Sequence, residues 1–135
     1  MANKTISATE TVKAMFTAFG AGNMDELKKN LSEDTVWVYH GTEEIPYNGT
    51  YKGKDEVVKF IGNIVGNVDI LGFQPIHFFE TGNRVVVLGN EKQRIKKNGK
   101  LLDQDWVQSF IVENGLITRL DEYANTSHAA KLFSK

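Results

Sequence analysis

A glutamate and a glutamine in the C-terminal third are candidates for a site of proton transfer, the glutamate to move the proton and the glutamine to donate a hydrogen bond. A strand period of two over residues 105–112 puts Gln108 on one face, between Trp106 and Phe110, a mixture that suits a small organic ligand. The next predicted strand carries Glu122 near its end. A carboxyl group in an apolar pocket has a raised pKa, which suits proton transfer near neutral pH. The alternative is a carboxylate at the sheet edge that pairs with a lysine.

A second acidic side chain, Glu91, lies in another alternating segment. Glu91 and Gln93 alternate with Lys92, Arg94 and Lys96. If the three basic side chains face solvent, Glu91 and Gln93 point to the interior. A ladder of charges on an ordinary strand surface shows the same alternation, so the sequence leaves both arrangements open.

Aromatic residues supply the walls of a possible pocket. Trp37 and Tyr39 share one face of a strand predicted over residues 35–39. A buried tyrosine usually finds a hydrogen-bond partner, so Tyr39 is a candidate donor to a ligand oxygen. The same two side chains are also typical of an ordinary apolar core in which the tyrosine hydroxyl is the only polar tip. Trp106 is best explained as a cavity wall.

Composition and missing motifs exclude several classes of function. With 16 basic and 17 acidic residues the formal net charge is -1, which offers no field for nucleic acid or anionic lipid. There is no cysteine, and His40, His77 and His128 lack metal-ligand spacing, so we expect neither a metal nor a cofactor. Nucleotide-binding and serine-hydrolase motifs are absent as well. No segment is apolar enough for a signal peptide or a membrane span, which predicts a cytoplasmic location.

Three helices are predicted in the first half of the chain and one at its end. Ser7 can cap the first helix. The apolar face of this helix consists of Val12, Met15, Phe16 and Phe19. Met24, Leu27 and Leu31 mark the second helix, residues 54–66 form the third, and residues 126–133 form the last.

The remaining segments are predicted strands and turns. Strands are expected over residues 35–39, 68–80, 84–96 and 105–112, with a final strand ending at Tyr123 and a loop over residues 41–53. Asn98-Gly99 is typical of a type I′ hairpin turn, in which both central residues have positive φ. Helices segregated from strands predict an α+β domain, in which helices cover one face of a curved, mainly antiparallel sheet.

Five segments in a particular order carry a family resemblance: residues 18–23, 31–37, 49–55, 82–89 and 114–123. On these segments the chain resembles the nuclear transport factor 2-like superfamily. Within it, the chain is similar to the SnoaL-like group, which includes polyketide cyclases. Limonene epoxide hydrolase and ketosteroid isomerase are more distant relatives.

The resemblance implies a cone-shaped α+β barrel with a deep apolar pocket, and a homodimer formed through the sheet. This fold hosts isomerases, cyclases, hydrolases and proteins that only bind ligands, so the chemistry depends on individual residues. Alignment with ketosteroid isomerase puts Tyr39 at the position of the carboxylate base and Met15 at that of the helix tyrosine. A steroid isomerase of the known type is therefore not expected.

The other two relatives match in part. Limonene epoxide hydrolase uses an Asp-Arg-Asp arrangement, and the alignment puts Glu91 and Glu122 at the acidic positions but Gly89 at the arginine. SnoaL-like cyclases use an acidic residue with a histidine on a neighbouring strand. Glu122 matches this acid, whereas Gln108 stands at the histidine. The resemblance thus implies carboxyl groups without their usual partners.

The sequence therefore predicts a small-molecule-binding protein of one domain, residues 1–135, for a hydrophobic, carbonyl-bearing organic molecule. The resemblance implies that it acts as a homodimer. One hypothesis is an enzyme without a cofactor, of cyclase, isomerase or hydrolase type; the other is a binding or interaction module without a reaction. The expected catalytic residues are Glu122, Tyr39 and Gln108. The expected substrate-binding residues are Trp37, Trp106, Glu91, Met15, Phe16, Phe19 and Phe110.

Overall fold

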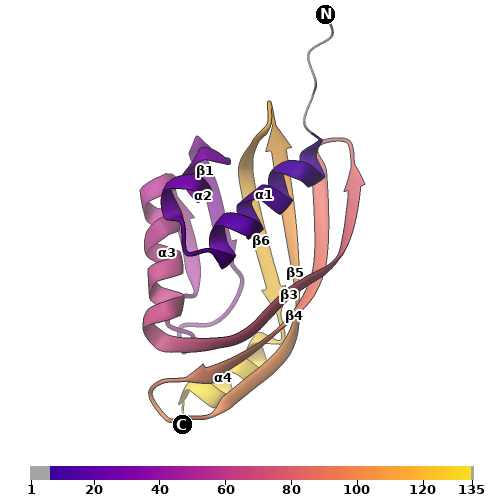
Figure 1. Cartoon of the computed structure of the whole chain (residues 1–135). Coiled ribbons are helices and arrows are strands. Elements are labelled where there is room, and N and C mark those ends of the chain that lie inside the picture. The colour runs from indigo at the N-terminus through magenta and orange to yellow at the C-terminus, as the bar shows by residue number, and fades with distance from the viewer. Residues whose placement is uncertain (1–6, 135) are drawn as a thin grey trace, which may run out of the picture.

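The computed structural model describes residues 7–134, which form helices and a six-stranded sheet (Figure 1). The chain begins with α1 (Ala8–Gly20), α2 (Met24–Lys29) and β1 (Leu31–Tyr39). These are followed by β2 (Gly49–Lys52), α3 (Lys54–Asn67) and β3 (Val68–Thr81). The C-terminal half contains β4 (Arg84–Ile95), β5 (Leu101–Glu113), β6 (Leu116–Ala124) and α4 (Thr126–Ser134).

The sheet has the strand order β2-β1-β6-β5-β4-β3. Every neighbouring pair is antiparallel except β1 and β6, which run parallel with Trp37 opposite Leu120 and Tyr39 opposite Glu122. The long strands curve around α1, while α3 stands beside β1 (Figure 1). The predicted α+β architecture with a curved, mainly antiparallel sheet is confirmed.

Polar caps start the first two helices. The Ser7 hydroxyl accepts a hydrogen bond from the Glu10 backbone N–H at 3.1 Å, and Asn23 accepts one from the Glu26 N–H at 3.1 Å. These bonds satisfy backbone donors that have no partner within the helix. The first turns therefore form where the sequence predicts them, and α1 can present its apolar face to the sheet.

Two segments differ in type from the expectation, and β5 begins at Leu101 rather than at residue 105. The apolar spacing predicts Leu31 in the second helix, but α2 ends at Lys29 and Leu31 begins β1, where it pairs with Ile117. The loop over residues 41–53 contains the short strand β2, which pairs with β1. Both differences arise because pairing with a distant strand overrides a local preference.

The expected type I′ turn at Asn98-Gly99 is also wrong. Of the two residues only Gly99 has a positive φ, 75°, and the Ile95 N–H donates across a longer loop to the Lys100 carbonyl. The Asn98 side chain is used elsewhere, because its Nδ2 donates to the Leu132 carbonyl near the end of α4 at 2.8 Å. Positive φ at both central residues occurs instead at Asn114 and Gly115, between β5 and β6.

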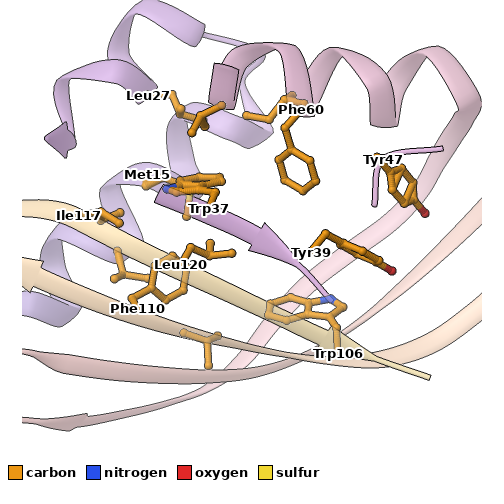
Figure 2. Close-up of a cluster of buried hydrophobic side chains, with 14 of the residues drawn as sticks. Met15, Leu27, Trp37, Tyr39, Tyr47, Phe60, Trp106, Phe110, Ile117 and Leu120 are labelled. Atoms are coloured by element: carbon orange, nitrogen blue, oxygen red, sulfur yellow. The ribbon is translucent and has the colours of Figure 1, made fainter. Parts of the chain in front are cut away.

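An apolar core fills the space between the helices and the concave face of the sheet. Figure 2 shows Leu27 and Phe60 reaching from the helices toward side chains of β5 and β6. The largest fully buried side chains include Trp106, Tyr47, Phe110, Leu27, Leu31 and Ile45. Complete burial of a large apolar side chain contributes about 1.5–3 kcal/mol. This packing holds the inward-facing residues of β4, β5 and β6 in fixed positions.

One glycine is required by close packing rather than by a turn. Gly89 faces inward on β4 opposite Trp106, and the indole covers its backbone. A Cβ at Gly89 would lie 2.6 Å from Trp106 Cε2 and 2.5 Å from the Gln74 carbonyl oxygen. Both distances are shorter than van der Waals contact, so only glycine fits here.

Replacing Gly89 with alanine should therefore destabilise the protein. Overpacking a core site typically costs about 1–3 kcal/mol, and here the indole and a backbone carbonyl must both shift. Urea unfolding followed by tryptophan fluorescence measures the loss. The matched control is Gly72→Ala in β3, where a Cβ would meet nothing within 4 Å. Equal stability of the two variants would contradict this account.

Candidate functional site

An inner chamber of about 50 Å³ lies between α1, α3 and the concave face of the sheet. Most of its wall is apolar, and its polar floor consists of Glu91, Gln93, Gln108 and Glu122. Within residues 7–134, no lysine, arginine or histidine lines it, so no side chain there neutralises the carboxyl groups. The apolar wall consists of Met15, Phe16, Phe19, Trp37, Phe60, Ile61, Ile64, Ile70, Phe73 and Leu120.

Glu122 is the more strongly perturbed carboxyl group. Its residue is 6% exposed, and it lies on β6 opposite Gln108, whose Nε2 donates to Glu122 Oε1 at 3.1 Å. Burial, with an added contribution from the nearby charge of Glu91, raises the pKa of Glu122 to about 8. The Gln108 hydrogen bond opposes this rise. Glu122 therefore carries its proton at neutral pH.

Glu91 lies in a better hydrogen-bonded position on β4. Gln93 Nε2 donates to Glu91 Oε1 at 2.9 Å, and Gln104 Nε2 donates to Oε2 at 2.6 Å. Burial raises the pKa of Glu91, while the Gln104 amide acts to lower it. Two donated hydrogen bonds favour the ionised form more than the single bond at Glu122 does. The geometry thus places the proton of the pair on Glu122 and the charge on Glu91.

Two buried tyrosines complete the polar cluster. Tyr47 Oη donates weakly to Gln93 Oε1 at 3.5 Å, and the Tyr39 hydroxyl has no hydrogen-bond partner within residues 7–134. Burial, with a further contribution from the nearby glutamates, raises the pKa of Tyr39 and of Tyr47. Both phenols therefore stay neutral and can act only as hydrogen-bonding groups.

Two polar atoms of chamber-lining residues are unpaired. Trp37 is 4% exposed and Gln108 is 6% exposed, yet neither Trp37 Nε1 nor Gln108 Oε1 has a partner in the described part of the chain. Leaving a buried donor or acceptor unpaired costs about 1–3 kcal/mol. A ligand that accepts a bond from the indole N–H would remove part of this cost.

The structure brings most of the predicted site residues together. Tyr39, Trp106 and Phe110 are buried but do not line the chamber. Trp106 and Phe110 lie behind Phe16, with ring centroids 6.1 and 5.9 Å from its own. The chamber is lined by Glu122, Gln108, Trp37, Glu91, Met15, Phe16 and Phe19.

Two residues of the polar cluster were not predicted from the sequence. Gln104 is buried and donates to Glu91, and Tyr47 packs against Tyr39 at a ring-centroid distance of 5.1 Å. Extending the alternation of Trp106 and Gln108 back along β5 would have placed Gln104 on the same inward face. The sequence carries no comparable signal for Tyr47, which lies between β1 and β2.

The epoxide-hydrolase arrangement is not available in this chamber. The arginine of that arrangement aligns with Gly89, and the Trp106 indole fills the space beside this position. A side chain here would meet the ring and the Gln74 carbonyl oxygen. The two glutamates therefore function without a guanidinium between them. Within residues 7–134, His, Asp and Glu side chains form no group of three that could hold a metal ion.

A curved sheet around helices, with a largely apolar chamber and a polar floor, defines a nuclear transport factor 2-like protein. The chain belongs to the SnoaL-like domain family, whose sequence profile matches residues 12–120. The resemblance expected from the sequence is thereby confirmed. No curated protein matches the chain.

Solved structures of the same fold cover nearly the whole chain. A nuclear transport factor 2-like protein from Burkholderia xenovorans is 28% identical, with 92% of this chain and 93% of that chain covered and a TM-score of 0.85. One of unknown function from Burkholderia pseudomallei is 26% identical, with 96% and 100% covered and a TM-score of 0.86. TerC, co-crystallised with polyporic acid, is 22% identical, with 95% and 98% covered and a TM-score of 0.81.

None of the helices formed by residues 7–134 has both the length and the apolar character needed to span a membrane.

Glu122→Gln should stabilise the protein increasingly as the pH rises from about 4.5 to about 8. The pKa of Glu122 is about 8 when folded, against 4.5 for an unperturbed glutamate, so the unfolded chain binds fewer protons in this window. Wild-type stability therefore falls with rising pH, whereas a glutamine has no proton to lose. One pKa unit corresponds to about 1.4 kcal/mol, so the gain is on the order of a few kcal/mol.

Urea unfolding of both proteins across this pH window measures the difference. The matched control is Glu43→Gln, which changes an exposed glutamate in the same way. A stability difference between wild type and Glu122→Gln that stays constant with pH would show that the pKa of Glu122 is not raised.

Proposed function

We propose that this SnoaL-like protein is an enzyme without a cofactor that transfers protons on a hydrophobic, carbonyl-bearing small molecule, as an isomerase or a cyclase does. The observation that carries the proposal is the pair of buried carboxyl groups in one chamber, with two amide donors on Glu91 and one on Glu122. Two carboxyl groups whose environments separate their pKa values form an acid–base pair.

The pair supports a balanced reaction at neutral pH. The Glu91 carboxylate removes a proton from a carbon next to the carbonyl, and the Glu122 carboxyl group gives its proton to the carbonyl oxygen. The product of this step is an enol. In an isomerase, Glu91 then returns its proton to a different carbon while Glu122 takes back the enol proton, which gives the isomer and restores both groups. In a cyclase, the enol carbon attacks a second carbonyl group, whose oxygen takes the proton of Glu91 while Glu122 takes back the enol proton, and the ring closes. The Trp37 indole N–H has no partner within residues 7–134, so a movement of the indole toward the chamber would let it donate to the substrate oxygen.

Gln108 and Tyr39 take more limited roles in this proposal than direct catalysis. The Gln108 amide donates to Glu122 and so orients the acid, which makes Gln108 a positioning residue. Tyr39 lies outside the chamber lining, and its hydroxyl contributes to the polar surroundings of both glutamates. The hydrolase alternative has less support, because Gly89 leaves no room for the arginine of that mechanism.

A ligand-binding module without a reaction is the second candidate. Its support is the glutamine at the position of the cyclase histidine. TerC, a protein of the same fold, was co-crystallised with polyporic acid, which supports an organic molecule as the occupant under either candidate. Only a measurement of proton transfer separates the two candidates.

Hydrogen–deuterium exchange at carbon tests proton transfer before the substrate is known. Incubated in D₂O with methyl ketones and 1,3-diketones, the wild-type protein should speed deuterium incorporation, measured by mass spectrometry. Glu91→Gln and Glu122→Gln should each lower the rate by about 10²–10⁴, the usual contribution of acid–base catalysis. The rate should also fall as the pH rises past about 8, where Glu122 loses its proton.

The exposed Glu43→Gln is the matched control and should exchange at the wild-type rate. Ketones that bind without any exchange would leave the ligand-binding module as the function. If Glu91→Gln and Glu122→Gln both exchange at the full wild-type rate, the proton transfer does not take place in the inner chamber.

We also propose that two copies of the chain associate through the outer face of the sheet. Leu88, Val107 and Tyr123 are direct neighbours across β4, β5 and β6, and they are 36%, 36% and 47% exposed. Contiguous exposed apolar side chains of this kind often mark an interface between proteins. The row runs across the centre of the sheet, on the face opposite the chamber.

Val107→Asp should disrupt this association, because it puts a charge at the middle of the row. Light scattering after size exclusion should give the wild type twice the chain mass of 15.1 kDa and the variant a single mass. Lys59→Asp, on the exposed side of α3, introduces a carboxylate elsewhere and should stay dimeric. A monomeric wild-type protein would rule out the interface.

A further inference from the structure

A second concavity, the outer groove, adjoins the inner chamber. It has a volume of about 560 Å³ and lies between the C-terminal end of α1, the middle of α3 and β3. The two spaces are adjacent, because the same side chains form the boundary between them. The shared lining residues are Phe16, Phe19, Ile61, Ile70 and Phe73.

The groove wall is apolar throughout its described lining. Met24, Val58, Val65 and Pro75 contribute side chains, and no charged residue of segment 7–134 lines it. Val65 is 47% exposed, so part of this wall faces water. Covering apolar surface contributes about 25 cal/mol per Å², which favours an apolar occupant.

Size links the groove to the chamber. Sites for drug-sized ligands have volumes of roughly 300–1,000 Å³. The inner chamber, at about 50 Å³, has room only for a small polar head group. A larger molecule with its carbonyl group beside the two glutamates must therefore extend past the boundary side chains. The groove is the adjoining space of sufficient volume.

The boundary itself consists of aromatic rings rather than backbone. The rings of Phe19 and Phe73 lie 5.2 Å apart between centroids, and those of Phe16 and Phe73 lie 5.9 Å apart. Phe16, Phe19 and Phe73 are each only partly buried. Aromatic side chains at a partly exposed boundary can rotate to admit a ligand and then pack against it.

We propose that the outer groove binds the uncharged apolar body of an amphiphilic substrate whose carbonyl head occupies the inner chamber. The inference rests on the proposed function only in placing the head group beside Glu91 and Glu122. The groove then selects substrates by the length of the apolar body. Gly62 of α3 is the residue that sets this selection, because its missing side chain leaves part of the groove open.

The position of Gly62 makes the proposal testable by substitution. A Cβ at Gly62 would meet nothing within 4 Å, and the residue has an ordinary helical backbone. A larger residue therefore fits α3 at a position that lines the groove. Gly66 lies one turn further along α3, is also exposed and also leaves a Cβ without contacts, but it does not line the groove. Gly66→Phe is thus a control for the effects of phenylalanine on this helix.

The experiment measures the binding of 2-butanone, 2-hexanone, 2-octanone and 2-decanone by calorimetry and by tryptophan fluorescence. For the wild type we expect Kd to fall about fourfold for each added methylene group that enters the groove, as expected for a fully buried CH₂. Gly62→Phe should flatten this dependence on chain length for the longer ketones. Gly66→Phe should keep the wild-type dependence.

An affinity that does not change with chain length, or equal slopes for Gly62→Phe and Gly66→Phe, would overturn the proposal. The deuterium-exchange rate of the same ketones is measured separately. Exchange without a chain-length dependence would overturn the groove and leave the proposed function standing. A chain-length dependence without exchange would support the groove and refute catalysis.

Discussion

The packing of Trp106 against the bare backbone of Gly89 determines how the concave face can be used. The indole occupies the space that a side chain on β4 would need, so neither a guanidinium nor any other group can be added there. On β5, Trp106 lies between Gln104 and Gln108, whose amides donate to different glutamates. The ring thereby keeps two carboxyl groups in two separate hydrogen-bonding environments within one site. This separation gives the pair unequal proton affinities.

The buried carboxyl group of Glu122 lowers the stability of the fold, and it is also the group whose raised pKa suits proton transfer. Burying Glu122 with one amide donor and no cation is unfavourable for the ionised form, and an apolar residue at this position would avoid that cost. The surrounding aromatic core offsets the cost through extensive apolar burial. The unpaired indole nitrogen of Trp37 adds a second local cost. Such costs concentrated around one chamber are typical of a functional site.

Alternation along strands carried most of the information in the sequence. The period of two put Glu91, Gln108 and Glu122 each on one face of its strand, and the structure shows that this is the inward face. The phase holds because the long strands of this sheet are regular. The residues and turns that the sequence did not predict depend on contacts between distant segments. Tyr47 reaches the site from a loop, and Asn98 leaves its expected turn conformation to donate to the end of α4. The size of the chamber likewise depends on how far helices stand from the sheet, which no local pattern encodes.

The parallel pairing of β1 with β6 has a consequence for the order of folding. Trp37 and Leu120 lie side by side in the sheet although most of the chain separates them. Contacts of such long sequence separation form late, because the entropy of closing a long loop opposes them. The hairpins formed by β3, β4, β5 and β6 can assemble from local contacts alone. Because β4, β5 and β6 follow one another through short connections, Glu91, Gln108 and Glu122 can come together early. The late pairing of β1 with β6 then adds Trp37 to the chamber wall and closes the chamber.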